Sequence, residues 1–141
     1  LGGVRANRYG TLPLDAFVRD ANASSLVICQ IETQGALSDL GTIARVDGID
    51  VLYVGPNDLT QALGIPGKYS DPAYQSELVR VATGAKEAGK AAGIMLARAD
   101  QMPPLLEMGY RFFTMSDRAL ILESARAWRA ALPARSPVGS V

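Results

Sequence analysis

The sequence predicts an α/β fold in which about four parallel strands alternate with helices, and two observations support this prediction. Short apolar runs without charged residues occur at residues 26–31, 51–54, 91–97 and 112–115. Such runs are typical of strands buried on both faces of a parallel sheet. The segments between them place apolar residues three and four positions apart, as on one face of a helix. Strands alternating with helices indicate parallel βαβ units.

The clearest helix lies between the second and third apolar runs. Asp71 is a favoured N-cap, Pro72 is tolerated at the first helical position, and Gly89 is typical of a helix end. The apolar face of this helix is predicted to consist of Tyr74, Leu78, Val81, Ala82 and Ala85.

Three other segments have helical periodicity. One begins near Gln34 and continues to residue 44, a second covers residues 100–108 before Gly109, and a third covers residues 118–132. Trp128 falls at helical spacing in the last of these and is expected in the core. Residues 133–141 are predicted to form a flexible tail.

The number of βα units indicates half of a larger domain. A closed (β/α)8 barrel needs about 250 residues, and four units supply half of one. A half barrel also exposes two long apolar edges. The chain starts at Leu1 without a methionine. We therefore expect residues 1–132 to be the C-terminal half of a single (β/α)8 TIM barrel, partnered by a missing N-terminal half.

Composition excludes several classes of function. Fourteen basic residues balance fourteen acidic ones, so no net charge would attract nucleic acid or an anionic membrane. No apolar stretch approaches the roughly 18 residues of a membrane span. A lone cysteine, Cys29, excludes an internal disulfide and fits the reducing cytoplasm. The absence of histidine excludes histidine-based catalysis and histidine-containing zinc sites from these residues.

Two carboxylates follow apolar strands at comparable positions. Because side chains two apart share a strand face, Gln30 and Glu32 project together, and Asp58 follows the next strand. Neighbouring parallel strands end at one rim, where α/β proteins bind ligands. Close carboxylates repel unless a cation lies between them, and oxygen ligands suit Mg²⁺ or Mn²⁺. The backbone amides of Asn57 and Asp58 could receive a substrate carboxylate.

Simpler interpretations of both carboxylates remain open at this point. Asp58, after a Gly-Pro turn, could be a helix N-cap. Glu32 could lie in the first turn of a helix and complement the helix dipole. By strand parity Cys29 faces away from Glu32, which indicates packing rather than nucleophilic catalysis. Lys68, Lys86 and Lys90 fall in a loop or near a helix end, which disfavours a Schiff-base mechanism.

The motifs around these residues resemble a known family. "QIET" at 30–33, a V-x-G-I-D segment at 46–50 and "GPNDLT" at 55–60 occur in the order and spacing of the HpcH/HpaI aldolase/citrate lyase family. The later "GKAAGIML" and "GYRFFTMSDRALI" are similar to the last two barrel strands of that family. The resemblance covers nearly all of residues 1–132.

The resemblance implies a class II, metal-dependent pyruvate aldolase. Such a carbon–carbon lyase cleaves or forms a 4-hydroxy-2-oxo acid from pyruvate and an aldehyde through a metal-stabilised enolate. It implies that Glu32 and Asp58 are the metal ligands, with Mg²⁺, Mn²⁺ or Co²⁺ as the cofactor. It also implies that Gln30, Asn57 and Asp58 bind the substrate. The family's base histidine and its arginine would come from the missing half, so this chain alone is expected to be inactive.

The resemblance also implies partners and leaves alternatives. Family members are homo-oligomers, typically hexamers of swapped dimers, so the helix near residues 124–132 is a candidate exchanged element. A citrate-lyase-like enzyme that cleaves acyl-CoA thioesters is one alternative function. A non-catalytic half barrel that serves as a structural module is another.

Overall fold

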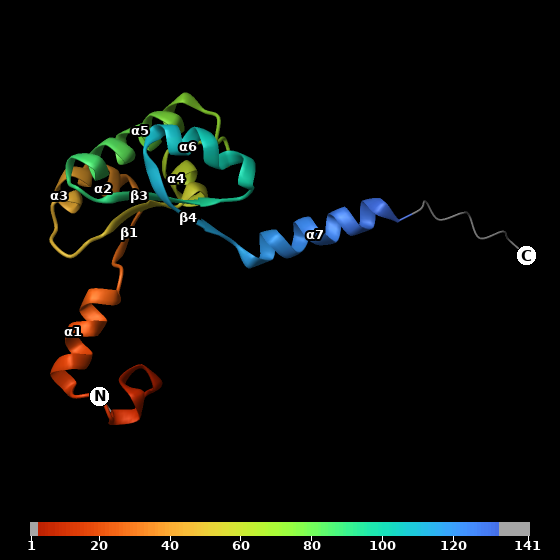
Figure 1. The fold of residues 1–141 in the computed structure, drawn as a ribbon. Helices are drawn as coiled ribbons and strands as arrows, with labels where there is room; N and C mark the ends of the chain where they lie inside the picture. The colour runs from red at the N-terminus through yellow and green to blue at the C-terminus, as the bar shows by residue number, and fades with distance from the viewer. Residues whose placement is uncertain (1–2, 133–141) are drawn as a thin grey trace, which may run out of the picture.

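A computed structural model describes residues 3–132 and contains one sheet of four parallel strands. These are β1 (Ile28–Ile31), β2 (Val51–Val54), β3 (Ala91–Leu96) and β4 (Tyr110–Met115), hydrogen-bonded in the order β1-β2-β3-β4. Each strand therefore neighbours the next one in sequence, as in half of a (β/α)8 barrel (Figure 1). The predicted fold class is confirmed. The predicted tail, residues 133–141, lies outside the described residues.

Helices cover one face of the sheet. They are α2 (Gln34–Ser38), α3 (Leu40–Ala44), α4 (Pro56–Ala62), α5 (Pro72–Glu87) and α6 (Met102–Met108), the last preceded by the 3-10 turn η2 (Ala99–Gln101). Alternate strand residues such as Ile31, Leu52 and Ile94 are buried against these helices, and Leu37, Leu59 and Leu78 meet them from the helical side. The core thus lies between the sheet and this single helical layer.

The predicted start and end of α5 are confirmed. The Ala73 backbone N–H donates to Asp71 Oδ1 at 2.9 Å, and Pro72 is the first helical residue. Gly89, with φ of +68°, turns the chain into β3. Tyr74 and Leu78 on the apolar face of α5 are buried, as periodicity predicted.

Several predicted boundaries were wrong by a few residues. The single helix expected from Gln34 to residue 44 is two helices, because Asp39 has φ of −96° and ψ of 8°. The strand expected at residue 26 begins at Ile28. The helix expected over 100–108 starts as the 3-10 turn, and β4 begins at Tyr110 rather than 112.

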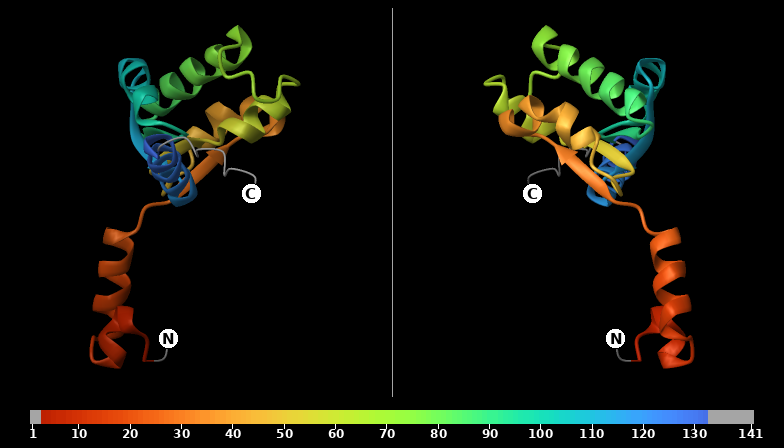
Figure 2. Two further views of the ribbon diagram at one scale, coloured as in Figure 1. Left: turned by 90° about the vertical axis from the view of Figure 1, so that its right-hand side faces the viewer. Right: turned by 90° about the vertical axis from the view of Figure 1, so that its left-hand side faces the viewer.

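Two elements extend away from the sheet. The N-terminal arm consists of the 3-10 segment η1 (Arg5–Gly10) and α1 (Leu14–Ser24), neither of which was predicted, and α7 (Asp117–Ala131) projects from the other side (Figures 1 and 2). Neither α1 nor α7 contains a buried residue. Trp128 is 75% exposed, so its predicted place in the core was wrong, because α7 does not pack on the sheet.

Strand burial also differs between β1 and β2. All four residues of β2 are buried, as predicted. The prediction that β1 is buried on both faces was wrong, since Ile28 is 44% exposed on the face opposite the helices. Nothing within residues 3–132 covers that face at β1. Separately, no helix in this described range combines the length and apolarity of a membrane span.

Candidate functional site

Gln30 and Glu32 lie together at the end of β1, on the face of the sheet opposite the helices, which we call the open face. Ile31 between them is fully buried against the helices, so the predicted strand parity is confirmed. The Gln30 side-chain Nε2 donates a hydrogen bond to Glu32 Oε2 at 2.5 Å. Cys29 is partly buried against the core, on the face away from Glu32, as expected.

The Glu32 carboxylate rests against Gly55 of the neighbouring strand end. In the β1–β2 register Gln30 is opposite Tyr53 and Ile31 is opposite Val54, which brings Glu32 level with Gly55. A Cβ built on Gly55 would overlap Glu32 Oε2 and would lie 2.9 Å from Gln30 Nε2 and 3.3 Å from Glu32 Cβ. The side chains of β1 therefore occupy the space that a side chain at residue 55 would need.

Asn57 and Asp58 lie in the first turn of α4, directly after Gly55. Gly55 is the N-cap of α4 and Pro56 its first residue, so the alternative of Asp58 as an N-cap is wrong. Asp58 is exposed. First-turn amides have no carbonyl partner within their own helix. The Glu32 carboxylate contacts Gly55, and Gly55 is three residues before Asp58 in the chain.

The alternative position of Glu32 in a helical first turn is also wrong. Helix α2 begins at Gln34, and its N-cap is Thr33, whose Oγ1 accepts from the Ala36 N–H at 3.1 Å. Glu32 precedes that cap and lies outside the helix. The structure thus shows that Asp58 is not an N-cap and that Glu32 does not lie in a helical first turn.

The side chain of Asn57 is held by a loop that sequence reasoning left as a plain connector. The Tyr69 hydroxyl donates to Asn57 Oδ1 at 2.5 Å. The same loop is tied to α4 where the Gly67 N–H donates to Thr60 Oγ1 at 3.1 Å. Thr60 is fully buried although it is polar. The loop after α4 therefore belongs to this edge of the sheet.

Aromatic and hydroxyl side chains lie on the open face of the strands. The Tyr53 hydroxyl lies 2.5 Å from Thr114 Oγ1, and the Tyr53 and Phe112 rings meet edge to face with centroids 6.2 Å apart. A Cβ on Gly93 would lie 2.8 Å from Val51 Cγ1 and 3.0 Å from each ring. Sequence reasoning missed this group, although the alternation along β2 and β4 could have identified it.

The edge of the sheet formed by the carboxyl ends of the strands, here called the carboxyl edge, also carries a charged pair after β3. Arg98 Nη2 lies 2.6 Å from Asp100 Oδ2, and both side chains are largely exposed. The hydrogen bond from Arg98 holds the pKa of Asp100 below its usual value, and the same bond raises the pKa of Arg98. Sequence analysis gave neither residue a role at the site, although both follow the end of β3 within four residues.

The donor set at this edge fits a hard divalent cation that retains other ligands. Glu32 and Asp58 supply carboxylate oxygens, which Mg²⁺ and Mn²⁺ prefer. Residues 3–132 contain no group of three or more histidine, cysteine, aspartate or glutamate side chains placed to hold a metal. Residues 3–132 would therefore offer a cation here at most two carboxylates, which fits a site that leaves positions for water and substrate.

No lysine in residues 3–132 is buried at this edge, although Lys68 lies in the loop after α4 that reaches it. Lys90 Nζ donates to the backbone oxygens of Val46 at 2.9 Å and Ile49 at 2.5 Å, in the loop that enters β2. Those residues lie at the opposite, amino end of the sheet. Lys68 and Lys86 are exposed, on a loop and on α5. This arrangement agrees with the expectation against a Schiff-base mechanism.

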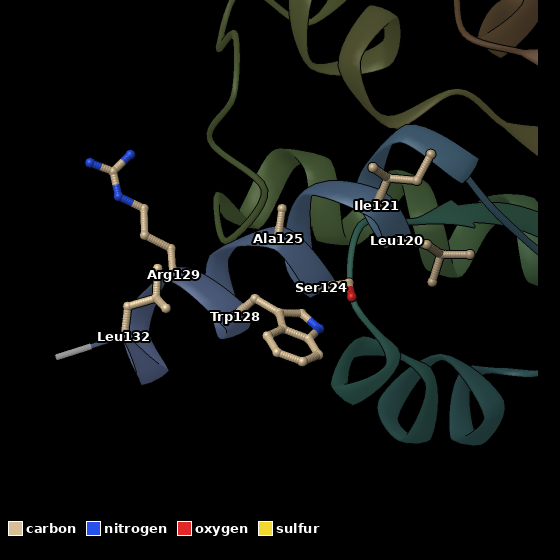
Figure 3. A pocket seen from close by; sticks show the side chains of 7 residues that line it. All are labelled: Leu120, Ile121, Ser124, Ala125, Trp128, Arg129 and Leu132. Carbon is tan, nitrogen blue, oxygen red and sulfur yellow. The ribbon is translucent and has the colours of Figure 1, made fainter.

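An apolar hollow lies away from the carboxylates, on α7. Figure 3 shows its lining side chains, all contributed by α7 or by the residue after it: Leu120, Ile121, Ser124, Ala125, Trp128, Arg129 and Leu132. Because one helix supplies every lining residue, the hollow is an uncovered helix face and not an enclosed ligand cavity.

The fold and the carboxyl edge together define a barrel-type α/β protein with an acidic, amide-lined strand edge. The chain belongs to the HpcH/HpaI aldolase/citrate lyase family, whose sequence model matches residues 5–117. It is similar to the 4-hydroxy-2-oxo-heptane-1,7-dioate aldolase of Salmonella arizonae, with 35% identity over 125 residues, or 88% of this chain and 47% of that protein. The chain spans about half the length of the curated relatives that it matches.

Solved structures agree with this assignment. An HpcH/HpaI aldolase/citrate lyase family protein from Burkholderia cenocepacia matches with a TM-score of 0.82 and 31% identity, over 92% of this chain and 50% of that one. The HpcH/HpaI aldolase from Desulfitobacterium hafniense matches with a TM-score of 0.81 and 26% identity, over 97% of this chain and 55% of that one. The four-stranded unit therefore corresponds to about half of each relative.

Proposed function

We propose that the complete protein is a metal-dependent carbon–carbon lyase that cleaves a 4-hydroxy-2-oxo acid to pyruvate and an aldehyde, or catalyses the reverse condensation. The observation that supports this most directly is the Gln30–Glu32 pair resting on Gly55, next to the first turn of α4. Family membership and the aldolase names of the relatives support the same reaction class.

We propose that Glu32 and Asp58 hold the divalent cation, Mg²⁺ or Mn²⁺, with Co²⁺ as a further candidate. Both residues follow neighbouring parallel strands, and neither carboxylate is used to cap a helix. When bound, the cation supplies a Lewis acid toward the oxygens of the oxoacid. The two carboxylates fix its position and leave room for those oxygens.

The neighbouring polar groups would bind and orient the oxoacid. The first-turn amides of Asn57 and Asp58 can donate to a substrate carboxylate, because they have no carbonyl partner within α4. Gln30 keeps a second amide hydrogen after it donates to Glu32, and its carbonyl oxygen can accept a further hydrogen bond. These roles are proposals that rest on position and hydrogen-bonding capacity.

We propose that the proton acceptor comes from outside these 141 residues, because they contain no histidine, the commonest general base at neutral pH. We propose that an N-terminal half barrel supplies a base histidine and an arginine across the open face. The open face at β1 is uncovered in the part of the chain that the structure describes, which leaves space for such a half. This chain alone is expected to bind the metal without turnover.

Pyruvate release tests the proposed reaction. We expect the complete protein with Mn²⁺ to release pyruvate from 4-hydroxy-2-oxo-heptane-1,7-dioate. The pyruvate is measured through its reduction by lactate dehydrogenase in a coupled assay. Addition of EDTA should abolish the signal, and added Mn²⁺ should restore it. Turnover that is unaffected by the chelator would contradict metal dependence. Cleavage of an acyl-CoA thioester in place of the oxoacid would favour the citrate-lyase-like alternative.

Titration calorimetry tests the proposed ligands. Mn²⁺ binding, measured with pyruvate present, should be lost in Glu32→Ala and in Asp58→Ala. Asp47→Ala is a suitable control, because Asp47 lies in the loop between α3 and β2, at the amino end of the sheet. Unchanged binding in either ligand variant would overturn the assignment of that residue.

A non-catalytic role is the second candidate, favoured by the absence of histidine. A half barrel that binds metal but never turns over, even with its partner half present, would fit that role. We also propose that the protein assembles into a homo-oligomer through α7. The uncovered apolar face of that helix supports this proposal.

A further inference from the structure

We infer that Gly55 is a positioning residue, whose missing side chain creates the space that fixes the Glu32 carboxylate at the edge of the sheet. The geometric part of this inference stands on the contacts of Gly55 alone. Its consequence for metal binding rests on the proposed function. The residue touches Glu32 and Gln30 and would act through them.

The requirement for glycine at residue 55 concerns space and not backbone conformation. Gly55 has φ of −90° and ψ of 96°, which any residue can adopt. Gly48 and Gly64 show the opposite case, because both have positive φ and neither has an atom within 4 Å of a built Cβ. Of the glycines in residues 3–132, Gly55 is the one against which a carboxylate oxygen rests.

The two carboxylate oxygens of Glu32 have different surroundings. Oε2 lies against Gly55 and accepts the hydrogen bond from Gln30. The structure gives the other oxygen, Oε1, no hydrogen-bond partner among the described residues. Gly55 and Gln30 therefore fix the position of Oε2, and Oε1 stays available to a cation.

The Gly55→Ala variant tests this inference in the presence of metal. Loss of groups that orient a metal ligand typically weakens metal binding by about 10-fold to 100-fold, and we expect a loss of that size in Mn²⁺ affinity. Gly84→Ala is the matched control, because its Cβ would lie 3.5 Å from Leu40 Cδ2, an ordinary contact in α5. The control should bind Mn²⁺ like the parent protein.

A measurement without metal tests the contact itself. The urea midpoint should fall modestly in Gly55→Ala, because the flexible end of Glu32 can move away from the new methyl group, and it should fall less in a Glu32→Ala background, where the overlapping oxygen is absent. The carboxyl ¹³C resonance of Glu32 should also shift in Gly55→Ala and stay unchanged in Gly84→Ala. This comparison remains informative if Gly55→Ala alone does not fold, since the double variant should fold.

The outcomes separate this inference from the proposed function. If the parent protein does not bind Mn²⁺, the metal proposal fails while the urea comparison still decides the contact. The inference would be overturned if Gly55→Ala lowered the urea midpoint equally in the parent and Glu32→Ala backgrounds. It would also be overturned if the double variant did not fold, or if the Glu32 resonance did not shift in Gly55→Ala. Parent binding of Mn²⁺ with unchanged affinity in Gly55→Ala would overturn it and leave the metal site intact.

Discussion

The hydroxyl of Tyr69 donates a hydrogen bond to Asn57 Oδ1 at 2.5 Å, which joins the loop after α4 to the first turn of that helix. The loop is supported from behind, since the Tyr69 and Tyr74 rings pack edge to face with centroids 5.9 Å apart. Gln75 Nε2 donates to the Tyr69 backbone oxygen at 2.7 Å. The loop thus orients Asn57 from a fixed position on α5.

Replacing Tyr69 by Phe should release the Asn57 side chain. The lost hydrogen bond is exposed, so we expect about 0.5–1 kcal/mol of lost stability, at the low end for a neutral hydrogen bond. Pyruvate affinity in the presence of Mn²⁺ should fall as well, because Asn57 is less well oriented. Urea unfolding and calorimetry measure both effects. Tyr9→Phe is the control, since Tyr9 is 72% exposed and lies in η1. Equal effects in the two variants would contradict the prediction.

The Tyr53–Thr114 hydrogen bond should couple β2 to β4 across β3. We expect Tyr53→Phe and Thr114→Val each to lower the free energy of unfolding by about 1 kcal/mol. Because both variants remove the same bond, the double variant should lose less than the sum of the two. Urea unfolding of the four proteins gives the coupling. Strict additivity would show that the short contact contributes nothing to stability.

Tyrosine burial should make the protein sensitive to alkaline pH. Burial, and secondarily the neighbouring Tyr74, raises the pKa of Tyr110 well above its usual value of 10.0. A raised folded pKa means that stability is complete below the usual value and falls as the pH rises above it, because only the unfolded state ionises there. Unfolding free energy should therefore decline above pH 10.0.

The Tyr110→Phe variant isolates this effect. It should lose about 1 kcal/mol at neutral pH, because the hydroxyl no longer donates to the Leu78 backbone oxygen at 3.0 Å. The free energy of unfolding of the variant should also decline less steeply above pH 10, because phenylalanine at residue 110 cannot ionise in the unfolded state. Urea unfolding between pH 7 and 11 measures both. An unchanged alkaline slope would show that Tyr110 does not contribute to the pH dependence.

The Arg98–Asp100 pair should be detectable as a lowered pKa of the Asp100 carboxyl group. Arg98 holds the pKa of Asp100 below its usual 3.8, mainly through the hydrogen bond. A lowered folded pKa favours the folded state above the usual value, and this contribution is lost as the pH falls through the folded pKa. Both groups are exposed, so the ¹³C titration of the Asp100 carboxyl group is the sensitive measurement. Arg98→Met should return that pKa toward 3.8, and an unshifted titration would contradict the pairing.

Substitutions on α7 should affect assembly and leave folding intact. Trp128 and Ile121 are 75% and 67% exposed, so Trp128→Ser and Ile121→Ser should leave the urea midpoint unchanged. Sedimentation velocity should show a smaller species if α7 joins copies of the protein. By contrast, Leu40→Ala in the core should cost about 2–5 kcal/mol of stability. An unchanged oligomeric state in both α7 variants would contradict the proposed contact.

Much of the sheet could be predicted because its signals are local. The strands, the α5 cap at Asp71 and the shared face of Gln30 and Glu32 follow from periodicity and capping chemistry, which neighbouring residues determine. The helical start at Gly55 was harder, because an aspartate after a Gly-Pro turn, as Asp58 is, can be taken as the cap. The choice depends on where the strand ends, which the sheet register decides.

The remaining features depend on contacts that sequence spacing does not encode. The Tyr69–Asn57 bond joins residues of a loop and a helix, and the Tyr53–Thr114 bond joins strands 61 positions apart. Trp128 was expected in the core because its spacing is that of a buried face, but periodicity does not state which surface a face packs against. Helix α1 was missed although Leu14, Phe17, Val18 and Ala21 have helical spacing, and it contains no buried residue within residues 3–132.

The two projecting helices make circular dichroism a measure of assembly as well as of folding. Helices of 11 and 15 residues are marginal in water without tertiary packing, and α1 and α7 have no buried residue in the described chain. Their amides should exchange with deuterium quickly in the isolated chain, whereas those of β2 should exchange slowly. Helical signal gained on mixing with a partner would then come from these two segments, at constant sheet content.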